Sequence, residues 1–440
     1  MNKATVAIVG RPNVGKSTFF NAILGERISI VEDTPGVTRD RIYGEADWSG
    51  REFALIDTGG IDPDTEDIIM QQMREQAVIA MEISDLVLFM VDGKEGLTSS
   101  DREVASMLMK KGKDVILVVN KVDNMKNLDN LYDFYELGLG EPVPISSVNR
   151  LNLGDLLDLI VSKLPEEKRE EEEDTIKLAV VGKPNVGKSS LVNSLLKEER
   201  VIVSPIPGTT RDSIDTYYEY EGEPYILIDT AGIRRRSKVD LNVEKYSVIR
   251  AISAIERSDV CLMMIDAVEG ITEQDKKIAG IAHEAGKGVV IVINKWDLIT
   301  KETNTMKTFE KDVYNEMPFL SYAPLVFISV KEGQRVNKVM EIAKTVALNR
   351  SVRISTGQLN ALIQDAVMMK QPPSDKGKRL KIYYVTQVGV KPPLFSFQIN
   401  KRELMHFSYS RYLENVIRDG FPFEGTSIKF VFREKGEKEI

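Results

Sequence analysis

The chain carries one ordered set of four short motifs twice. GRPNVGKS at Gly10–Ser17 returns as GKPNVGKS at Gly182–Ser189, and PGVTRD, LIDTGG and NKVD return downstream as PGTTRD, LIDTAG and NKWD. The interval is 172 positions for the first three motifs and 174 for the fourth. A single short motif can recur by chance, but four in the same order at a nearly constant interval indicate duplication of a whole domain.

Each copy alternates apolar strand patterns with helical patterns. Continuous apolar runs such as DLVLFMVD at Asp85–Asp92 are typical of strands buried on both faces of a sheet. Ser49-Gly50 and Glu221-Gly222 interrupt strand patterns and predict hairpin turns. We therefore expect two α/β domains, each with a doubly wound, mostly parallel sheet.

The last part of the chain differs from both copies. Residues Asn349–Ile440 hold 16 Lys and Arg against 9 Asp and Glu, whereas the whole chain has a formal net charge of −8. The pattern runs helix, two strands, short helix, helix and strand, which predicts a small α+β domain. A basic module on an acidic protein favours an anionic partner, with nucleic acid first.

These patterns divide the 440 residues into three domains and a linker. We place the first α/β domain at residues 1–164, the second at 176–349 and the basic domain at 350–440. The linker, residues 165–175, has the sequence PEEKREEEEDT. It is an acidic run without apolar periodicity, which is most simply a solvated connection.

The first motif predicts a phosphate-binding loop in each copy. The loop at Gly10–Ser17 follows a strand and opens a helix, the context in which backbone N–H groups of a glycine-rich loop cradle phosphates. We expect Lys16 and Lys188 to reach the β- and γ-phosphates. Ser17 and Ser189 are expected to supply a hydroxyl to Mg²⁺.

The second and third motifs add a Mg²⁺ and γ-phosphate site. In the first copy, Asp57 ends a strand and suits Mg²⁺, Gly60 can present its N–H to the γ-phosphate, and Thr38 fits a switch threonine that closes on Mg²⁺. In the second copy, alignment with GVTRD selects Thr210 over the adjacent Thr209. The predicted catalytic residues are Lys16, Thr38, Gly60, Lys188, Thr210 and Gly232. The predicted Mg²⁺ residues are Ser17, Thr38, Asp57, Ser189, Thr210 and Asp229.

The fourth motif predicts that the base is guanine. Asp123 and Asp297 can each accept hydrogen bonds from guanine N1–H and its 2-amino group, and adenine offers neither donor, so an adenine complex would leave a carboxylate unpaired. Downstream, ISSV at Ile145–Val148 and ISV at Ile328–Val330 fit a last base-contact loop. In it, the backbone N–H groups of Ser147 and Val330 would donate to the base oxygen.

The predicted GTP contacts in the first copy are Gly10, Asn13, Val14, Gly15, Lys16, Ser17, Thr18, Asp57, Asn120, Lys121, Asp123, Ser146 and Ser147. Those in the second copy are Gly182, Asn185, Val186, Gly187, Lys188, Ser189, Ser190, Asp229, Asn294, Lys295, Asp297, Ser329 and Val330. In each copy the asparagine is expected to brace the base loop and the lysine to lay its stem over the base.

Both copies resemble the translation-factor-related GTPases, whose five sequence elements are present twice here. Over essentially its whole length the chain resembles the Der (EngA) family of bacterial double-domain GTPases. The resemblance rests on the tandem PNVGKS loops followed by a small basic domain. It implies hydrolysis of GTP to GDP and phosphate, a KH-like C-terminal domain packed between the GTPase domains, and action on the large ribosomal subunit.

Two positions depart from a common GTPase pattern. Many GTPases place a glutamine directly after D-x-x-G to orient the attacking water, but Ile61 and Ile233 stand there. We therefore expect slow intrinsic hydrolysis. The related family uses K⁺ held partly by a P-loop asparagine, and Asn13 and Asn185 occupy that place. K⁺ activation is thus a hypothesis, and the alternative is that each asparagine only holds its loop.

The terminal domain also departs from an RNA-binding KH module, which clamps nucleotides with a G-x-x-G loop between two helices. HFSYS at His406–Ser410 stands near that place. RNA contact would then use other surfaces, such as DKGKRLK at Asp375–Lys381. Tyr383, Tyr384 and Phe397 can stack on bases or pack in the core, and strand alternation favours the core for at least some of them.

The two copies differ after the third motif. The first continues with the acidic segment GGIDPDTED at Gly59–Asp67, and the second with the basic segment AGIRRRSKVD at Ala231–Asp240. A basic switch ordered by the γ-phosphate can couple the nucleotide state to RNA or to the terminal domain. The alternative is a solvated switch without a partner.

We therefore expect a GTP-binding and GTP-hydrolysing factor for ribosome biogenesis, whose partners are GTP or GDP, the large ribosomal subunit and ribosomal RNA. The alternative is a GTP-regulated switch acting on a protein or membrane target without RNA. The basic terminal domain counts against it, and so does the lack of an apolar run that spans a bilayer. A single cysteine, Cys261, excludes an intrachain disulfide, and we expect a cytoplasmic monomer without membrane contact.

Overall fold

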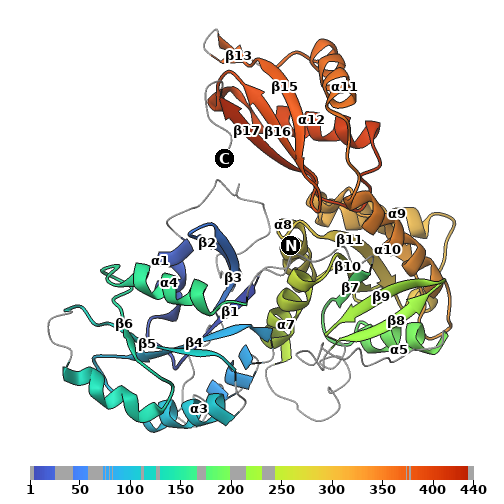
Figure 1. Cartoon of the computed structure of the whole chain (residues 1–440). Coiled ribbons are helices and arrows are strands. Elements are labelled where there is room, and N and C mark those ends of the chain that lie inside the picture. The colour runs from blue at the N-terminus through green and yellow to red at the C-terminus, as the bar shows by residue number, and fades with distance from the viewer. Residues whose placement is uncertain are drawn as a thin grey trace. The chain divides into compact units, whose positions relative to one another are not determined.

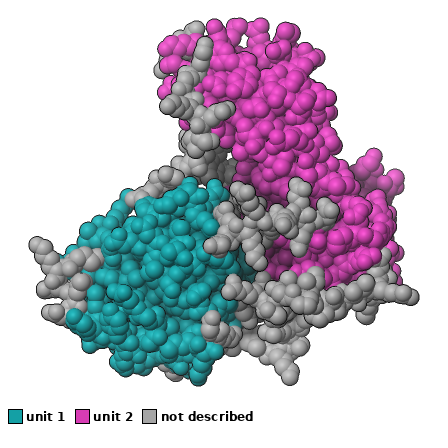
Figure 2. Space-filling model, in the orientation of Figure 1, with its two compact units in different colours: residues 1–173, 242–253 teal, residues 174–241, 254–440 magenta. Residues whose placement is uncertain are grey.

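The protein is described by a computed structural model that forms two compact units, residues 1–173 with 242–253 and residues 174–241 with 254–440 (Figure 2). The described residues are 4–24, 43–57, 73–74, 76–78, 80–81, 83–110, 113–124, 129–165, 175–198, 215–229, 243–372, 374–375 and 378–434. Nearly all of the predicted linker lies outside them. So do the acidic and basic switch segments and the predicted residues Thr38, Gly60, Thr210 and Gly232.

The first copy folds around a six-stranded sheet of order β2-β3-β1-β4-β5-β6, in which only β2 pairs antiparallel (Figure 1). Its strands are β1 (Ala4–Val9), β2 (Tyr43–Trp48), β3 (Arg51–Asp57), β4 (Leu86–Asp92), β5 (Val115–Asn120) and β6 (Val143–Pro144). Its helical elements are α1 (Lys16–Leu24), α3 (Ser99–Lys110), the 3₁₀ segment η1 (Asp129–Leu137) and α4 (Leu153–Lys163).

Two apolar cores, one on each face, make this sheet doubly wound. Phe19 of α1 and Leu156 of α4 pack with Ile8 on one face. Leu108 of α3 packs with Phe89 on the other. Because both faces are covered, the central strands are apolar at every position, which is why the sequence shows continuous apolar runs and not alternation.

The second copy repeats this topology, with sheet order β8-β9-β7-β10-β11-β12. The strands are β7 (Ile176–Val181), β8 (Thr216–Tyr220), β9 (Glu223–Ile228), β10 (Val260–Asp266), β11 (Gly288–Asn294) and β12 (Leu325–Phe327). The helices are α5 (Lys188–Glu198), α7 (Val243–Arg257), α8 (Glu273–Glu284), α9 (Thr305–Glu316) and α10 (Val336–Arg350), with 3₁₀ segments η2 (Trp296–Leu298) and η3 (Pro318–Leu320). The predicted pair of doubly wound α/β domains is confirmed.

Both predicted hairpin turns are present. Ser49 and Gly50 have φ of 54° and 79°, and Glu221 and Gly222 have φ of 50° and 79°. Two consecutive left-handed residues form the turn whose twist matches that of the flanking strands. The turn residues were therefore enough to predict each hairpin, and the structure places its antiparallel strand at the edge of the sheet.

The C-terminal domain is a three-stranded sheet, β15-β16-β17, covered by helices. Its elements are α11 (Thr356–Met369), the strand pair β13 (Ser374–Asp375) and β14 (Lys378–Arg379), β15 (Ile382–Gly389), β16 (Leu394–Ile399), the 3₁₀ segment η4 (Arg402–Leu404), α12 (Phe407–Gly420) and β17 (Lys429–Glu434). Phe395, Phe397, Tyr409 and Leu413 lie at the centre of its core. The predicted order of helices and strands is confirmed, except that the short pair β13-β14 was not predicted and that Lys378 and Arg379 belong to it and not to β15.

This domain packs directly on the second α/β domain within one unit. The Val289 N–H donates to the Gly425 carbonyl at 2.8 Å, and Asn349 Nδ2 donates to the Glu424 carbonyl at 3.0 Å. The Arg418 guanidinium lies 4.5 Å from the centre of the Tyr322 ring. Val289 belongs to β11, so the C-terminal domain is bonded near the start of the strand whose end carries NKWD.

Candidate nucleotide-binding sites

The phosphate-loop lysine has the same geometry in both copies. Lys16 Nζ donates to the carbonyls of Gly10 and Arg11, each at 2.7 Å. Lys188 Nζ donates to the carbonyls of Gly182 and Lys183 at 2.7 and 2.6 Å. The loop carbonyls thus hold each ammonium at the N-terminus of α1 or α5, where a helix end favours phosphate.

Glycine is required at the first and last glycine positions of each loop. A Cβ on Gly10 would lie 2.3 Å from the Met90 carbonyl oxygen, so only glycine lets the loop lie against β4. Gly15 has φ of 97°, and a Cβ there would lie 2.3 Å from Asn120 Nδ2. Gly187 has the same geometry with Asn294. The loop can therefore approach the base motif only because it has no side chain at this point.

An asparagine joins the phosphate loop to the base loop in each copy. Asn120 Nδ2 donates to the Val14 carbonyl at 2.8 Å, while its Oδ1 accepts the Ser147 N–H at 3.0 Å. Asn294 Nδ2 donates to the Val186 carbonyl at 2.8 Å, and its Oδ1 accepts the Val330 N–H at 3.1 Å. The two N–H groups predicted to face the base oxygen donate to these asparagines here, so that assignment stays a prediction.

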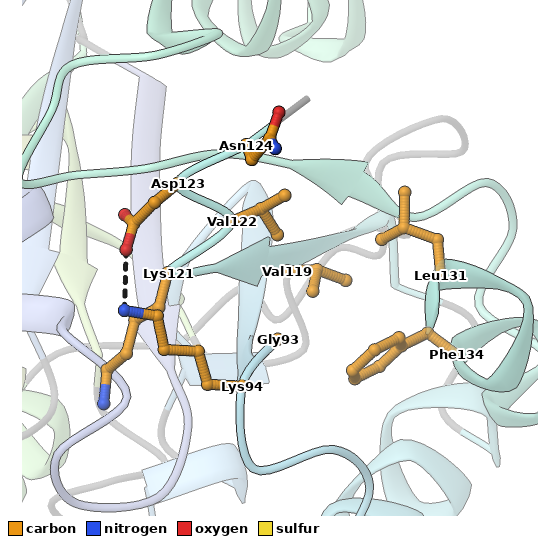
Figure 3. Close-up of a pocket in the computed structure, with 9 residues that line it drawn as sticks. All are labelled: Gly93, Lys94, Val119, Lys121, Val122, Asp123, Asn124, Leu131 and Phe134. Carbon is orange, nitrogen blue, oxygen red and sulfur yellow. Dashed lines mark ion pairs between the residues drawn. The ribbon is translucent and has the colours of Figure 1, made fainter. Parts of the chain in front are cut away.

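The predicted base-reading carboxylate of the first copy sits in a network of donors. Ser146 Oγ and Asn149 Nδ2 donate to Asp123 Oδ1 at 2.7 and 3.0 Å. Lys94 Nζ lies 2.6 Å from Asp123 Oδ2, and Figure 3 shows this ion pair. The Lys94 ammonium, followed by the Ser146 hydroxyl, lowers the pKa of Asp123 below its ordinary value. Asp123 is therefore an acceptor at neutral pH, as guanine recognition requires.

The second copy lacks this lysine. The backbone N–H of Lys94 donates to Asp92 at the end of β4, and the backbone N–H of Val268 donates to Asp266 at the end of β10. Val268 therefore occupies the position of Lys94, and it is 57% exposed. The Ser329 hydroxyl lowers the pKa of Asp297. Glu332 follows Ser329 at the position where Asn149 follows Ser146. The two sites thus share the carboxylate and the serine but differ in the charge around them.

Sequence reasoning missed a second aspartate at each base site. Asp92 ends β4 and pairs with Lys121 Nζ at 2.6 Å, and Asp266 ends β10 and pairs with Lys295 Nζ at 2.5 Å. Burial raises the pKa of Asp92, but the hydrogen bond from Lys121 and those from two backbone N–H groups outweigh it and hold the pKa below its ordinary value. The available signal was that these aspartates recur at the NKxD interval of 174 positions.

The one residue that differs between the two loops, Arg11 against Lys183, performs the same role in both. Arg11 pairs with Glu95 and lies 3.6 Å from the buried Asp101, which caps α3 through Thr98. Lys183 pairs with Glu269 at 2.5 Å. Either cation therefore ties the phosphate loop to the segment after β4 or β10, and this role was also missed.

The Mg²⁺ assignment is compatible with the geometry of the first copy. Ser17 Oγ donates to Asp57 Oδ2 at 2.8 Å, which places a hydroxyl and a carboxylate oxygen side by side beside the phosphate loop. Oxygen ligands of this kind suit Mg²⁺. GTPases use Mg²⁺ to bridge the β- and γ-phosphates and to neutralise charge that develops between them.

The other predicted residues are distributed around these groups. Val14, Val186, Ser146 and Ser329 are buried, whereas Asn13, Thr18, Asn185 and Ser190 are exposed. Asn13 and Asn185 have left-handed backbones, with φ of 64° and 63°. Asp229 and Ser189 lie at the end of β9 and the start of α5, as Asp57 and Ser17 lie at β3 and α1.

Comparison with known proteins identifies the family. A family model described as 50S ribosome-binding GTPase matches residues 5–121 and 177–295, and one described as the C-terminal KH-domain-like region of EngA bacterial GTPases matches residues 353–433. GTPase Der of Ruminiclostridium cellulolyticum is 62% identical and that of Alkaliphilus metalliredigens 60% identical, each over 100% of both chains. The chain belongs to the GTPase Der family.

As a member of the Der family, the chain binds GTP and hydrolyses it to GDP and phosphate, and its C-terminal domain is KH-like. GTPase Der of Acetivibrio thermocellus, a further relative, is 61% identical over 100% of both chains. No helix among the described residues is both long and apolar enough to span a bilayer.

Proposed function

We propose that this Der-family GTPase serves ribosome biogenesis by docking on the large ribosomal subunit in a nucleotide-dependent way. The observation that carries this proposal is the family match, because both GTPase domains fit a model described as a 50S ribosome-binding GTPase. The basic balance of the KH-like domain supports a ribosomal RNA partner. A cytoplasmic, monomeric protein is part of the same proposal.

Sedimentation with purified ribosomal particles tests the proposal. The full chain would be bound to GDP, GTP or a non-hydrolysable GTP analogue and sedimented at two salt concentrations. We expect co-migration with the large subunit in the GTP-like state only. Absence of co-migration in every state would leave the GTPase chemistry intact and redirect the function to a protein or membrane target.

The individual site assignments belong to the proposal as well. It assigns domains at 1–164, 176–349 and 350–440, with Thr38 and Thr210 as switch threonines on Mg²⁺. Lys16 and Lys188 would hold the phosphates, and the backbone N–H groups of Gly60 and Gly232 would contact the γ-phosphate. Because Ile61 and Ile233 cannot orient water, intrinsic hydrolysis would be slow.

K⁺ is proposed as an activating ion at Asn13 and Asn185. Both side chains are exposed on left-handed turns of the phosphate loops, so their amide oxygens are available to a ligand. We expect faster GTP hydrolysis in potassium than in sodium buffer. The N13D substitution should change the K⁺ dependence of hydrolysis at the first site. Equal rates in the two buffers would exclude a K⁺ role.

A further inference from the structure

One face of the sheet of the KH-like domain packs against helices, and the opposite face, here called the open face, carries the exposed residues Tyr383 and Tyr384. In one row across the strands, Val385, Phe397 and Phe432 are partners and belong to the core cluster beneath the helices. Figure 1 shows α11 and α12 together on one side of the three arrows. Side chains alternate across a strand, so the neighbouring row, Tyr384, Gln398 and Arg433, belongs to the opposite face.

A β-bulge places two tyrosines on that open face. The register passes from Ile382 opposite Ile399 to Tyr384 opposite Gln398, which leaves Tyr383 as an extra residue in β15. A bulge interrupts strict alternation and re-aims a side chain. As a result two consecutive residues are both exposed, Tyr383 by 47% and Tyr384 by 45%, whereas the next residue, Val385, is fully buried.

The described charged residues in the row of Tyr384 and directly before β15 are cations. Lys381, directly before β15, is exposed, and Arg433 of β17 is half-buried in the row of Tyr384. Lys378 and Arg379 of the separate strand β14 are also exposed, and Lys378 lies opposite Asp375 of β13. Glu434 is the one carboxylate in β15, β16 and β17, and it lies one residue beyond Arg433, where its Oε1 accepts the Arg402 N–H at 2.9 Å.

We propose that this tyrosine face, defined as Lys381, Tyr383, Tyr384, Gln398 and Arg433, binds single-stranded RNA. Aromatic rings provide stacking platforms for bases, and cations beside them pair with phosphates. Charge complementarity and the half-exposed rings favour RNA over an apolar protein partner. The inference rests on the proposed ribosomal function, and it supplies an RNA surface for a domain that has no G-x-x-G loop.

The first test uses the full chain, with GDP held constant, and a fluorescein-labelled oligouridine of twelve nucleotides. Anisotropy titrations at several KCl concentrations would compare Tyr384→Ala with Tyr384→Phe. We expect Tyr384→Ala to weaken binding about 5- to 100-fold with an unchanged salt slope, because a stacking contact is lost without a charge. Tyr384→Phe keeps the ring and should bind like the wild type.

Charge variants provide an independent readout. Arg433→Gln should reduce the salt slope by about 0.7, the contribution of one phosphate contact on a single strand. Tyr132→Ala is the matched control, because Tyr132 is 74% exposed on η1 of the first GTPase domain. All variants should have the GTP hydrolysis rate and the melting temperature of the wild type. These two measurements test whether a variant is misfolded.

Three results would contradict the proposal that the tyrosine face binds RNA. They are failure of the wild type to bind the oligonucleotide, wild-type binding by Tyr384→Ala, or equal losses in Tyr384→Ala and Tyr132→Ala. Inorganic polyphosphate distinguishes stacking from mere charge. If Tyr384→Ala weakens polyphosphate and oligouridine equally, base stacking is wrong.

The failures of the two proposals can be told apart. If the wild type co-migrates with large subunits but Tyr384→Ala binds oligouridine normally, the ribosomal function stands and the face is wrong. If oligouridine binding depends on Tyr384 but the wild type never co-migrates, the face stands and the ribosomal target fails.

Discussion

The two nucleotide sites are alike around the phosphates and differ at the rim of the base. Lys16 and Lys188 make the same two bonds to loop carbonyls, and Asn120 and Asn294 make the same bridge. At the predicted base rim, Lys94 pairs with Asp123 of the first site, whereas Val268 stands at that place in the second. The two copies thus share the contacts that hold the loop backbone and differ in the charge beside the predicted base-reading carboxylate.

The largest expected effect is a change of base at either site. Asp123→Asn and Asp297→Asn replace one acceptor by a donor that faces the guanine 2-amino group, so each should weaken GDP binding at its own site about 100-fold. Binding of xanthine nucleotides should rise at the same site, because xanthine carries an oxygen there. Titration calorimetry with GDP and XDP measures both.

Retention of two wild-type GDP sites in either variant would contradict the assignment of these carboxylates. The single variants also isolate the sites, since Asp297→Asn leaves GDP to the first site and Asp123→Asn leaves it to the second.

The next effect tests the shared geometry. Gly15→Ala and Gly187→Ala place a Cβ 2.3 Å from the bridging asparagine amide and impose a positive φ on alanine. Strain of this kind costs about 1–3 kcal/mol, so each should weaken GDP binding at its site about 10- to 100-fold. Gly50→Ala is the control for positive φ alone, because a Cβ at Gly50 meets no atom within 4 Å. Unequal losses of GDP affinity at the two sites would show that the two phosphate loops are not equivalent.

A smaller effect tests the difference between the sites. Lys94 shares Asp123 with the base, so Lys94→Val in the Asp297→Asn background should tighten GDP binding about two- to fivefold, the range of an exposed ion pair. The reciprocal change, Val268→Lys in the Asp123→Asn background, should weaken the second site by a similar factor. Both differences should shrink as salt rises. Weaker binding by Lys94→Val would show that the lysine assists the base.

The smallest effect concerns pH. The pKa values of Asp123 and Asp297 both lie below the ordinary aspartate value. A carboxyl with a lowered pKa keeps its charge until the pH falls below its ordinary range. The terminal phosphate of GDP also titrates between pH 8 and pH 5 but affects both sites alike. The ratio of GDP affinities at the two sites should therefore change less than about twofold between pH 8 and pH 5. A marked loss of GDP affinity near pH 6 at only one site would indicate a raised carboxyl pKa at that site. The two base sites would then differ in their carboxyl pKa.

The sequence by itself determined the duplication, the two doubly wound sheets, the hairpin turns and the phosphate loops. These depend on contiguous residues, such as Ser49-Gly50 or the loop that begins at Gly10, whose backbone preferences act locally. The order of elements in the KH-like domain was predictable for the same reason.

Only the tertiary structure decided which side chains meet. Asp92 ends β4, Lys121 directly follows the neighbouring parallel strand β5, and Lys94 reaches Asp123 from the loop after β4. Tyr383 and Tyr384 share a face because one extra residue interrupts the strand. A local pattern gives the face and period of an element. Contacts between strand ends, and a bulge that shifts the period, depend on pairing between segments far apart in the chain.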